Sequence, residues 1–186
     1  SRLRDAGSAA EGFHRLPGGK REVAVPFALT KENAALFGQR VNAVVRGYIE
    51  AQNSIFKFSF LKALGLKRVD PAAAAAKADA LRTQAQSMLD EVRELKLEAG
   101  DPLHEFFMTM TDTLDRITAD LRSLQTAMTF FIDLCNSMTA AQADTRSRYW
   151  KERYKKDLEE LQQKETDYLA IGNELNQRWK KIAEKQ

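Results

Sequence analysis

The stretch that decides the fold is Leu103–Met138, LHEFFMTMTDTLDRITADLRSLQTAMTFFIDLCNSM. Its apolar residues recur at alternating spacings of four and three, which is the heptad pattern of a helix that packs lengthwise against other helices. The stripe consists of Leu103, Phe107, Met110, Leu114, Ile117, Leu121, Leu124, Met128, Phe131, Cys135 and Met138. It predicts an all-α protein, an elongated antiparallel three- or four-helix bundle with a long, coiled-coil-like C-terminal helix.

The first helix of this bundle is predicted over residues 31–64. Thr30 is a good N-cap in front of it, and apolar residues then recur in threes and fours as far as Phe58. Gly65 is a natural C-terminal stop. Residues 1–28 are interrupted by glycine and proline and show no period, so we expect a loosely structured arm there and the helical bundle over 29–186.

Two Asp-Pro pairs divide the rest of the chain. Asp70-Pro71 and Asp101-Pro102 each place a capping carboxylate before a proline at the first helical position. They begin predicted helices over 71–98, closed by Gly100, and from residue 102 onward. Because short connections fold helices back on themselves, neighbouring helices should be antiparallel.

The last part of the chain leaves two arrangements open. Helices are predicted over 102–142 and 145–183, either separate or continuous, and the absence of a strong breaker in 136–147 favours one rod of roughly 120 Å. Shorter helices would leave the end of such a rod uncovered. Unless the chain bends back as a fourth bundle helix, its last stripe is therefore a coiled-coil partner face, made of Tyr168, Leu175, Trp179 and Ile182.

The composition excludes several classes of protein. An apolar share of 44% and a charged share of 30% are typical of a folded chain, and a net charge of +3 is too small to indicate nucleic-acid binding. A single cysteine allows no internal disulfide, and no run approaches the ~18 consecutive apolar residues of a membrane span. With no secretory signal in the given sequence either, a cytoplasmic location is favoured over secretion.

No residue pattern indicates catalysis. His104-Glu105 resembles the start of a zinc motif, but Met108 stands where the second histidine is needed. Cys135 lies on the apolar stripe, where a thiol behaves as a small hydrophobe. Gly18-Gly19-Lys20 lacks the spacing of a phosphate-binding loop. We therefore expect no enzyme, no cofactor, no metal ion and no small-molecule substrate.

Two segments are candidate contact sites. Segment 55–66 is the most apolar of the chain and ends at a predicted loop, so it is either bundle core or a tip that enters a membrane or a partner's groove. The residues of this apolar tip are Phe56, Phe58, Phe60, Leu61 and Leu64. Segment 146–156 is basic and interleaved with aromatic residues. It pairs with acidic residues of a partner helix, contacts phosphate groups, or contacts an anionic membrane surface. The residues of this basic patch are Arg146, Arg148, Lys151, Arg153, Lys155 and Lys156.

Two functions fit these patterns. The first is a non-enzymatic helical-bundle interaction module that acts by oligomerisation or scaffolding through its long C-terminal helix, with a protein partner or a second copy. The alternative is a membrane-acting bundle, curvature-sensing or pore-forming, that uses the apolar tip 55–66 or the basic patch 146–156. Helix 31–64 is mostly basic and residues 105–144 mostly acidic, so these two helices are also expected to attract each other.

Overall fold

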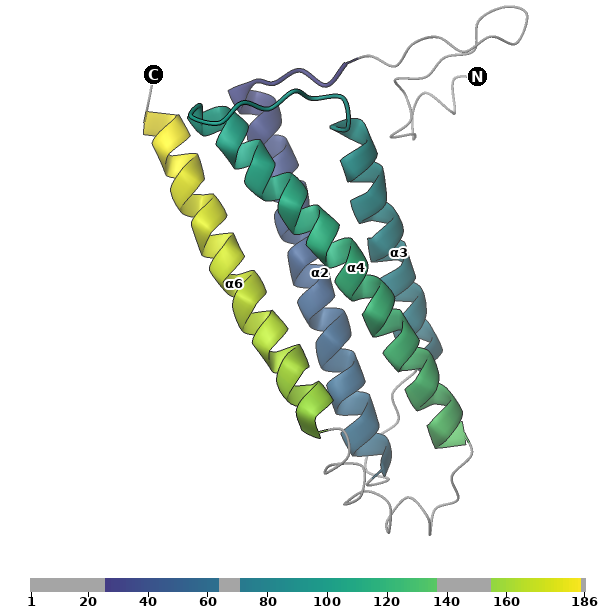
Figure 1. The fold of residues 1–186 in the computed structure, drawn as a ribbon. Helices are drawn as coiled ribbons and strands as arrows, with labels where there is room; N and C mark the ends of the chain where they lie inside the picture. Colours follow the sequence, from purple (N-terminus) through teal and green to yellow (C-terminus); the bar gives the residue numbers. More distant parts are fainter. Residues whose placement is uncertain (1–25, 64–70, 137–154, 185–186) are drawn as a thin grey trace, which may run out of the picture.

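The computed structural model describes residues 26–63, 71–136 and 155–184, and the side chains within 26–54, 72–129 and 159–184. These residues form the helices α2 (Lys31–Ala63), α3 (Pro71–Glu91), α4 (Pro102–Asn136) and α6 (Lys155–Glu184), and no strand. Figure 1 shows the helices side by side, with α2 and α4 running in one direction and α3 and α6 in the other. The prediction of an all-α antiparallel bundle is confirmed, and the described part of the chain has four helices.

A central pair of helices organises the bundle. α2 and α4 contact each other, and each of them also contacts α3 and α6. Within the described residues α3 and α6 make no contact, so they lie on opposite sides of the α2–α4 pair. The pair therefore presents two separate grooves, one filled by α3 and one by α6.

The core follows the predicted stripe of α4. Leu114, Ile117 and Leu121 have no exposed surface, so the heptad pattern faces inward as predicted. The other stripe residues of α4 that are at most 3% exposed are Phe107, Met110, Leu124 and Met128. α2 buries its own stripe against them, through Ala34, Phe37, Val41, Val44, Tyr48 and Ala51.

Capping residues fix where α2 and α4 begin. The Thr30 hydroxyl accepts a hydrogen bond from the Asn33 amide at 3.1 Å, as expected of an N-cap. The Asp101 carboxylate accepts hydrogen bonds from the Leu103 and His104 amides at 2.9 and 3.2 Å. Both caps were predicted from the sequence, and both are confirmed.

The predicted end of the second helix is wrong. Helix 71–98 was expected to run up to Gly100, but α3 ends at Glu91. The amides of Val92 and Leu95 bond to carbonyls three residues earlier, which tightens the chain into turns. Leaving the helix lets Leu95 and Leu97 pack against the core.

The continuous C-terminal rod is also excluded. The rings of Phe106 in α4 and Trp179 in α6 lie 5.7 Å apart between centroids. In one straight helix these residues would be about 110 Å apart, at 1.5 Å per residue. α6 instead runs back along α4, which is the fourth-helix arrangement that the sequence left open.

Candidate functional site

Polar contacts between α4 and α6 form a cluster in the middle of the bundle. The Tyr168 hydroxyl of α6 donates a hydrogen bond of 2.6 Å to Asp120 Oδ2 of α4. Lys164 Nζ lies 3.1 Å from the other carboxylate oxygen of Asp120. Arg116 donates a hydrogen bond of 3.0 Å to Asp167 Oδ2, and its guanidinium lies 5.2 Å from the centroid of the Tyr168 ring. The cluster therefore joins the two helices through charged groups as well as apolar packing.

Tyr48 of α2 is packed against this cluster without completing it. Its ring centroid lies 4.9 Å from that of Tyr168, and both side chains are fully buried. Burial raises the pKa of Tyr48, and burial followed by the hydrogen bond to Asp120 raises the pKa of Tyr168. Both phenols stay neutral at physiological pH, so Tyr168 acts as a donor and neither is a base.

Two buried polar atoms of α2 have no hydrogen-bond partner among the described residues. They are the Tyr48 hydroxyl and the Gln52 Oε1, one turn apart on the same helix face. Gln52 itself is only 2% exposed. An unsatisfied buried polar group costs about 1–3 kcal/mol, so this region of the core carries an energetic penalty.

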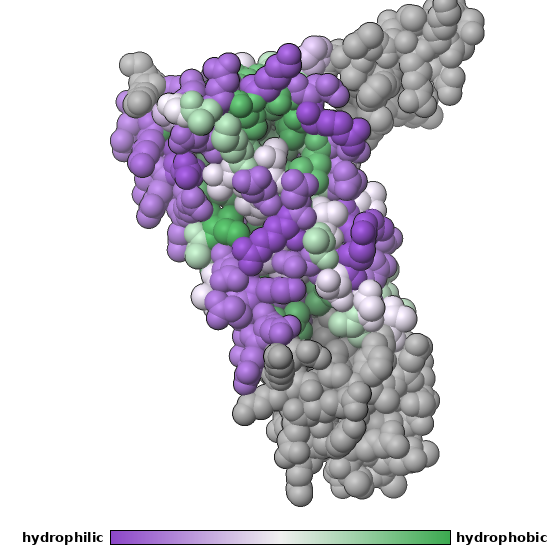
Figure 2. Space-filling view, viewed as in Figure 1, coloured by the Kyte–Doolittle hydropathy of each residue, from purple (hydrophilic) through white to green (hydrophobic). Residues whose placement is uncertain are grey.

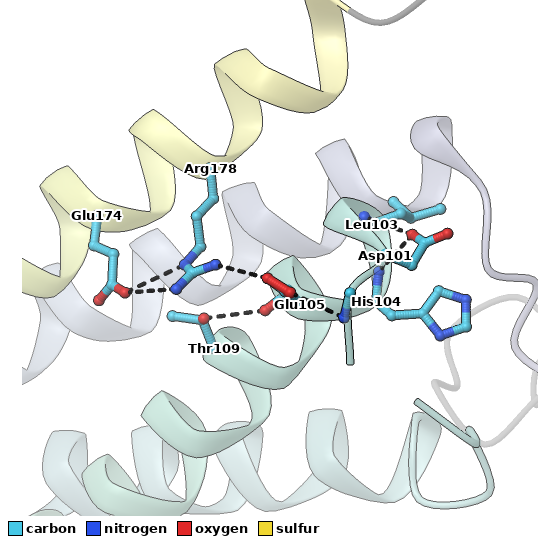
Figure 3. A network of polar contacts seen from close by, with 8 residues as sticks. Asp101, Leu103, His104, Glu105, Thr109, Glu174 and Arg178 are labelled. Atoms are coloured by element: carbon cyan, nitrogen blue, oxygen red, sulfur yellow. Dashed lines mark hydrogen bonds and ion pairs between the residues drawn. The ribbon is translucent and has the colours of Figure 1, made fainter. Parts of the chain in front are cut away.

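A second set of polar contacts joins α6 to the beginning of α4 (Figure 3). Arg178 of α6 reaches Glu105 Oε1 of α4 at 3.7 Å and also bonds Glu174 on its own helix at 3.1 Å. The other oxygen of Glu105 accepts a hydrogen bond from the Gly100 amide at 3.2 Å. Glu105 therefore ties α6 to the connection between α3 and α4.

The most buried residues of α6 are seven positions apart, and two charged residues near them in the sequence pair with α4. Tyr168, Leu175 and Ile182 are at most 3% exposed. Half-buried Leu161 continues the series by one heptad. Lys164 and Arg178 lie three positions after Leu161 and Leu175, where a coiled coil has its second apolar residue. These cations meet Asp120 and Glu105, so the inner face of α6 is partly ionic.

Two ion pairs of α2 join it to α3, although α4 was the helix expected to attract it. Arg40 makes two hydrogen bonds of 2.9 and 2.5 Å to the Glu91 carboxylate of α3, and the bond to Glu91 raises the pKa of Arg40. Glu50 pairs with Lys77 of α3 at 3.0 Å. These charged residues of α2 lie on the face that meets α3. The net charge of a helix does not show which of its faces carries the charged residues.

The predicted C-terminal partner face is occupied by the chain's own bundle. Tyr168, Leu175 and Ile182 are buried against α2 and α4, and half-buried Trp179 packs on Phe106. As a surface that waits exposed for another chain, this face was predicted wrongly, because the prediction assumed a straight rod. The helix itself does have the coiled-coil spacing that was read from the sequence.

The two other predicted contact segments lie outside the described side chains. Of the apolar tip, Phe56, Phe58, Phe60 and Leu61 lie on the backbone of α2, and Leu64 is beyond it. Of the basic patch, Lys155 and Lys156 begin α6, and Arg146, Arg148, Lys151 and Arg153 precede it. The helix directions nevertheless place the end of α2 and the start of α6 at the same end of the bundle (Figure 1).

Sequence reasoning missed the cluster around Asp120. One signal was present, because a tyrosine and a lysine four residues apart share a helix face with the apolar seam of α6. Their acidic partner lies 48 residues from Tyr168 in the sequence. Such a pairing becomes visible only when the direction of α6 is known.

Three further observations complete the description of the site. Within the described residues, no group of three or more His, Cys, Asp or Glu side chains is arranged to hold a metal ion. None of the described helices combines the length and apolar character needed to cross a membrane. Comparison with protein-family models, with curated proteins and with solved structures gave no match.

Proposed function

We propose that this protein is a non-enzymatic helical-bundle interaction module that works by self-association or by scaffolding a protein partner through its C-terminal helix. The observation that carries the proposal is the inner face of α6. It combines apolar residues seven positions apart with flanking ion pairs to Asp120 and Glu105. This is the composition of a coiled-coil interface, in which apolar side chains supply affinity and charges select the partner.

The sides of the bundle support the same proposal. Figure 2 shows mainly hydrophilic residues over the described part of one face, with hydrophobic residues visible in patches among them. Only Leu36 and Leu169 stand out as large exposed apolar side chains among the described residues. Scattered single residues of this kind are ordinary on a protein surface. Contacts through the apolar residues of α6 would therefore involve the groove that α6 occupies, rather than an apolar patch on the outside.

Self-association is tested by light scattering coupled to size-exclusion chromatography over a hundred-fold range of concentration. The proposal expects a concentration-dependent species of twice the 21.0 kDa chain mass. A monomer at every concentration that also captures no protein under cross-linking would contradict it. The matched variant is Leu36→Ser, which changes an exposed apolar residue outside the α6 groove and should leave the mass distribution unchanged.

A second candidate function is action at a membrane surface, favoured by one observation. The apolar segment 55–66 and the basic segment 146–156 are attached to helix ends that lie together, at the end of α2 and the start of α6 (Figure 1). Aromatic and basic residues in combination are typical of segments that bind anionic headgroups.

Liposome co-sedimentation distinguishes this second candidate. Vesicles with 30% anionic lipid should bind the wild-type chain more strongly than neutral vesicles, and ~0.5 M salt should weaken that binding. The double variant Phe58→Asp with Phe60→Asp should lose binding while its helical circular dichroism persists. If the double variant unfolds instead, the aromatic residues belong to the core. Absence of binding by the wild-type chain at low salt would reject membrane action.

A further inference from the structure

The groove between α2 and α4 that holds α6 recognises a particular kind of helix. Along it, Tyr48 contacts Tyr168 and Phe106 contacts Trp179, so the helix must present an aromatic or apolar seam. Asp120 and Glu105 of α4 are 15 residues apart and meet Lys164 and Arg178 of α6, which are 14 apart and run in the opposite direction. The groove thus selects an antiparallel amphipathic helix whose two cations are two heptads apart.

Charged residues on the seam make partner choice more specific and docking weaker. A cation in place of an apolar residue at a heptad core position lowers stability while it fixes register. Beneath α6 the Tyr48 hydroxyl, and one turn further along α2 the Gln52 Oε1, are buried with no hydrogen-bond partner in the described part of the chain. When α6 leaves, water can hydrogen-bond to those of these groups that become exposed. The free-energy cost of separating α6 from the groove is therefore lower than for a purely apolar interface.

The opposite groove is built differently. There α3 places Ala78, Ala85 and Met88 against the central pair with no exposed surface. Gly47 of α2 and Leu81 of α3 are so close that a methyl group on Gly47 would meet the Leu81 side chain at 2.7 Å. In chain order α3 lies between α2 and α4, the two helices of the central pair, whereas α6 does not lie between them. Of the two helices that flank the central pair, α6 is therefore the one whose exchange leaves the connections between α2, α3 and α4 in place.

We propose that α6 leaves its own groove and docks in the groove of a second copy, which donates its own α6 in return. This inference rests on the proposed function and names its partner. The argument for a second copy is complementarity, because among the described helices α6 is the one that fits the apolar seam and pairs with both acidic residues. The exchange re-forms the same contacts between chains that exist within one chain, and reciprocal exchange closes as a symmetric dimer. Its extent is therefore set by the protein concentration.

A charge exchange between two chains tests the inference. Arg116 and Asp167 form an exposed pair across the α4–α6 interface, with 45% and 37% of their side-chain surfaces accessible. One chain carries Arg116→Glu and the other carries Asp167→Lys, so each chain alone places like charges together. In an exchanged heterodimer, both grooves contain opposite charges again. The two chains are mixed, held at a denaturant concentration below global unfolding, returned to buffer at high concentration and weighed by native mass spectrometry.

The expected result is a ratio of heterodimer to the geometric mean of the two homodimers that exceeds its statistical value by roughly 2- to 30-fold, which is the range for two exposed pairs restored at once. The control pair is Glu50→Lys mixed with Lys77→Glu, which alters the ion pair between α2 and α3 and should give dimers in statistical proportion. If either test chain does not fold, Glu105→Arg mixed with Arg178→Glu serves in the same design, since those residues also pair across the interface.

The other outcomes are informative in different ways. Dimers of the test chains in statistical proportion would overturn the exchange of α6 while leaving self-association intact. Test chains that remain monomers while the wild-type chain dimerises would also overturn the exchange. A wild-type chain that stays monomeric under the same treatment would overturn the exchange together with the self-association proposed above.

Discussion

Replacement of Gly47 by alanine sets two effects of known sign against each other. Gly47 lies inside α2, and alanine at a helix interior is favoured over glycine by about 0.5–1 kcal/mol. However, the new methyl group would lie 2.7 and 2.9 Å from the two terminal carbons of Leu81, and 3.4 Å from its Cγ. Leu81 must therefore shift, and it is half-buried and packed against the core. Overpacking of this kind typically costs about 1–3 kcal/mol.

The overpacking term should win, and Gly47→Ala should lower the free energy of unfolding by about 1 kcal/mol. The matched control is Gly172→Ala in α6, where no atom lies within 4 Å of the added carbon. That variant should be more stable than the wild-type chain by about 0.5–1 kcal/mol, because only helix propensity changes. Both are measured by urea denaturation followed by circular dichroism, with the m-value checked for constancy.

A double-mutant cycle locates the cause. Leu81→Ala removes the two carbons that the new methyl group meets, so Gly47→Ala should become neutral or stabilising in that background. If Gly47→Ala were as stabilising as Gly172→Ala in the wild-type background, the close approach of α2 and α3 would not constrain the fold, and the reasoning would be refuted.

Four other perturbations have expected outcomes. Leu114→Ala should cost about 2–5 kcal/mol by urea denaturation, because Leu114 has no exposed surface, whereas Leu36→Ala at 59% exposure should stay within about 0.5 kcal/mol. Tyr48→Phe removes a buried hydroxyl that has no hydrogen-bond partner among the described residues, so it should leave stability unchanged or raise it. Tyr168→Phe should cost about 1–3 kcal/mol, because Asp120 loses the hydroxyl that donates to it. A large loss of stability in Tyr48→Phe would contradict this. Asp101→Ala should cost about 1 kcal/mol, seen as a lower melting temperature, because two amides of α4 lose their acceptor. Hydrogen bonds from Gln163 and Arg116 lower the pKa of Asp167, so the ionised carboxylate stabilises the fold at neutral pH. This contribution is lost as the pH falls below about 4, and Asp167→Asn should make unfolding curves less sensitive to acid.

The features that the sequence predicted correctly are those that depend on local periodicity. The stripe from Phe107 to Met128 determines which face of α4 is buried, whatever the partner helices are. Thr30 and Asp101 cap their helices through atoms three residues away or fewer. A local pattern is sufficient in each of these cases, because the stabilising contact forms within one element.

The features that the sequence did not predict depend on contacts between elements. Residues 92–98 have a helix-compatible composition, but Leu95 and Leu97 reach the core only after the helix ends. The return of α6 along α4 has no local signal, since no strong helix breaker separates the two helices in the sequence. The pairing of Asp120 with Tyr168 follows from that return and could not be predicted without it.

The two sides of the central helix pair therefore differ in what they are optimised for. On the α3 side, small residues and an apolar seam bring the helices close, which gives stability through packing density. Ion pairs also join α2 to α3, through Arg40–Glu91 and Glu50–Lys77, but on the α6 side the cations Lys164 and Arg178 stand at heptad positions and pair with acidic residues of α4. An apolar residue at either position would serve a permanently closed bundle about as well, because ion pairs whose side chains are 15–38% accessible contribute only about 0–1 kcal/mol. These charges can instead select one helix among several competing helices. Such selection is useful only if the α6 groove meets more than one helix.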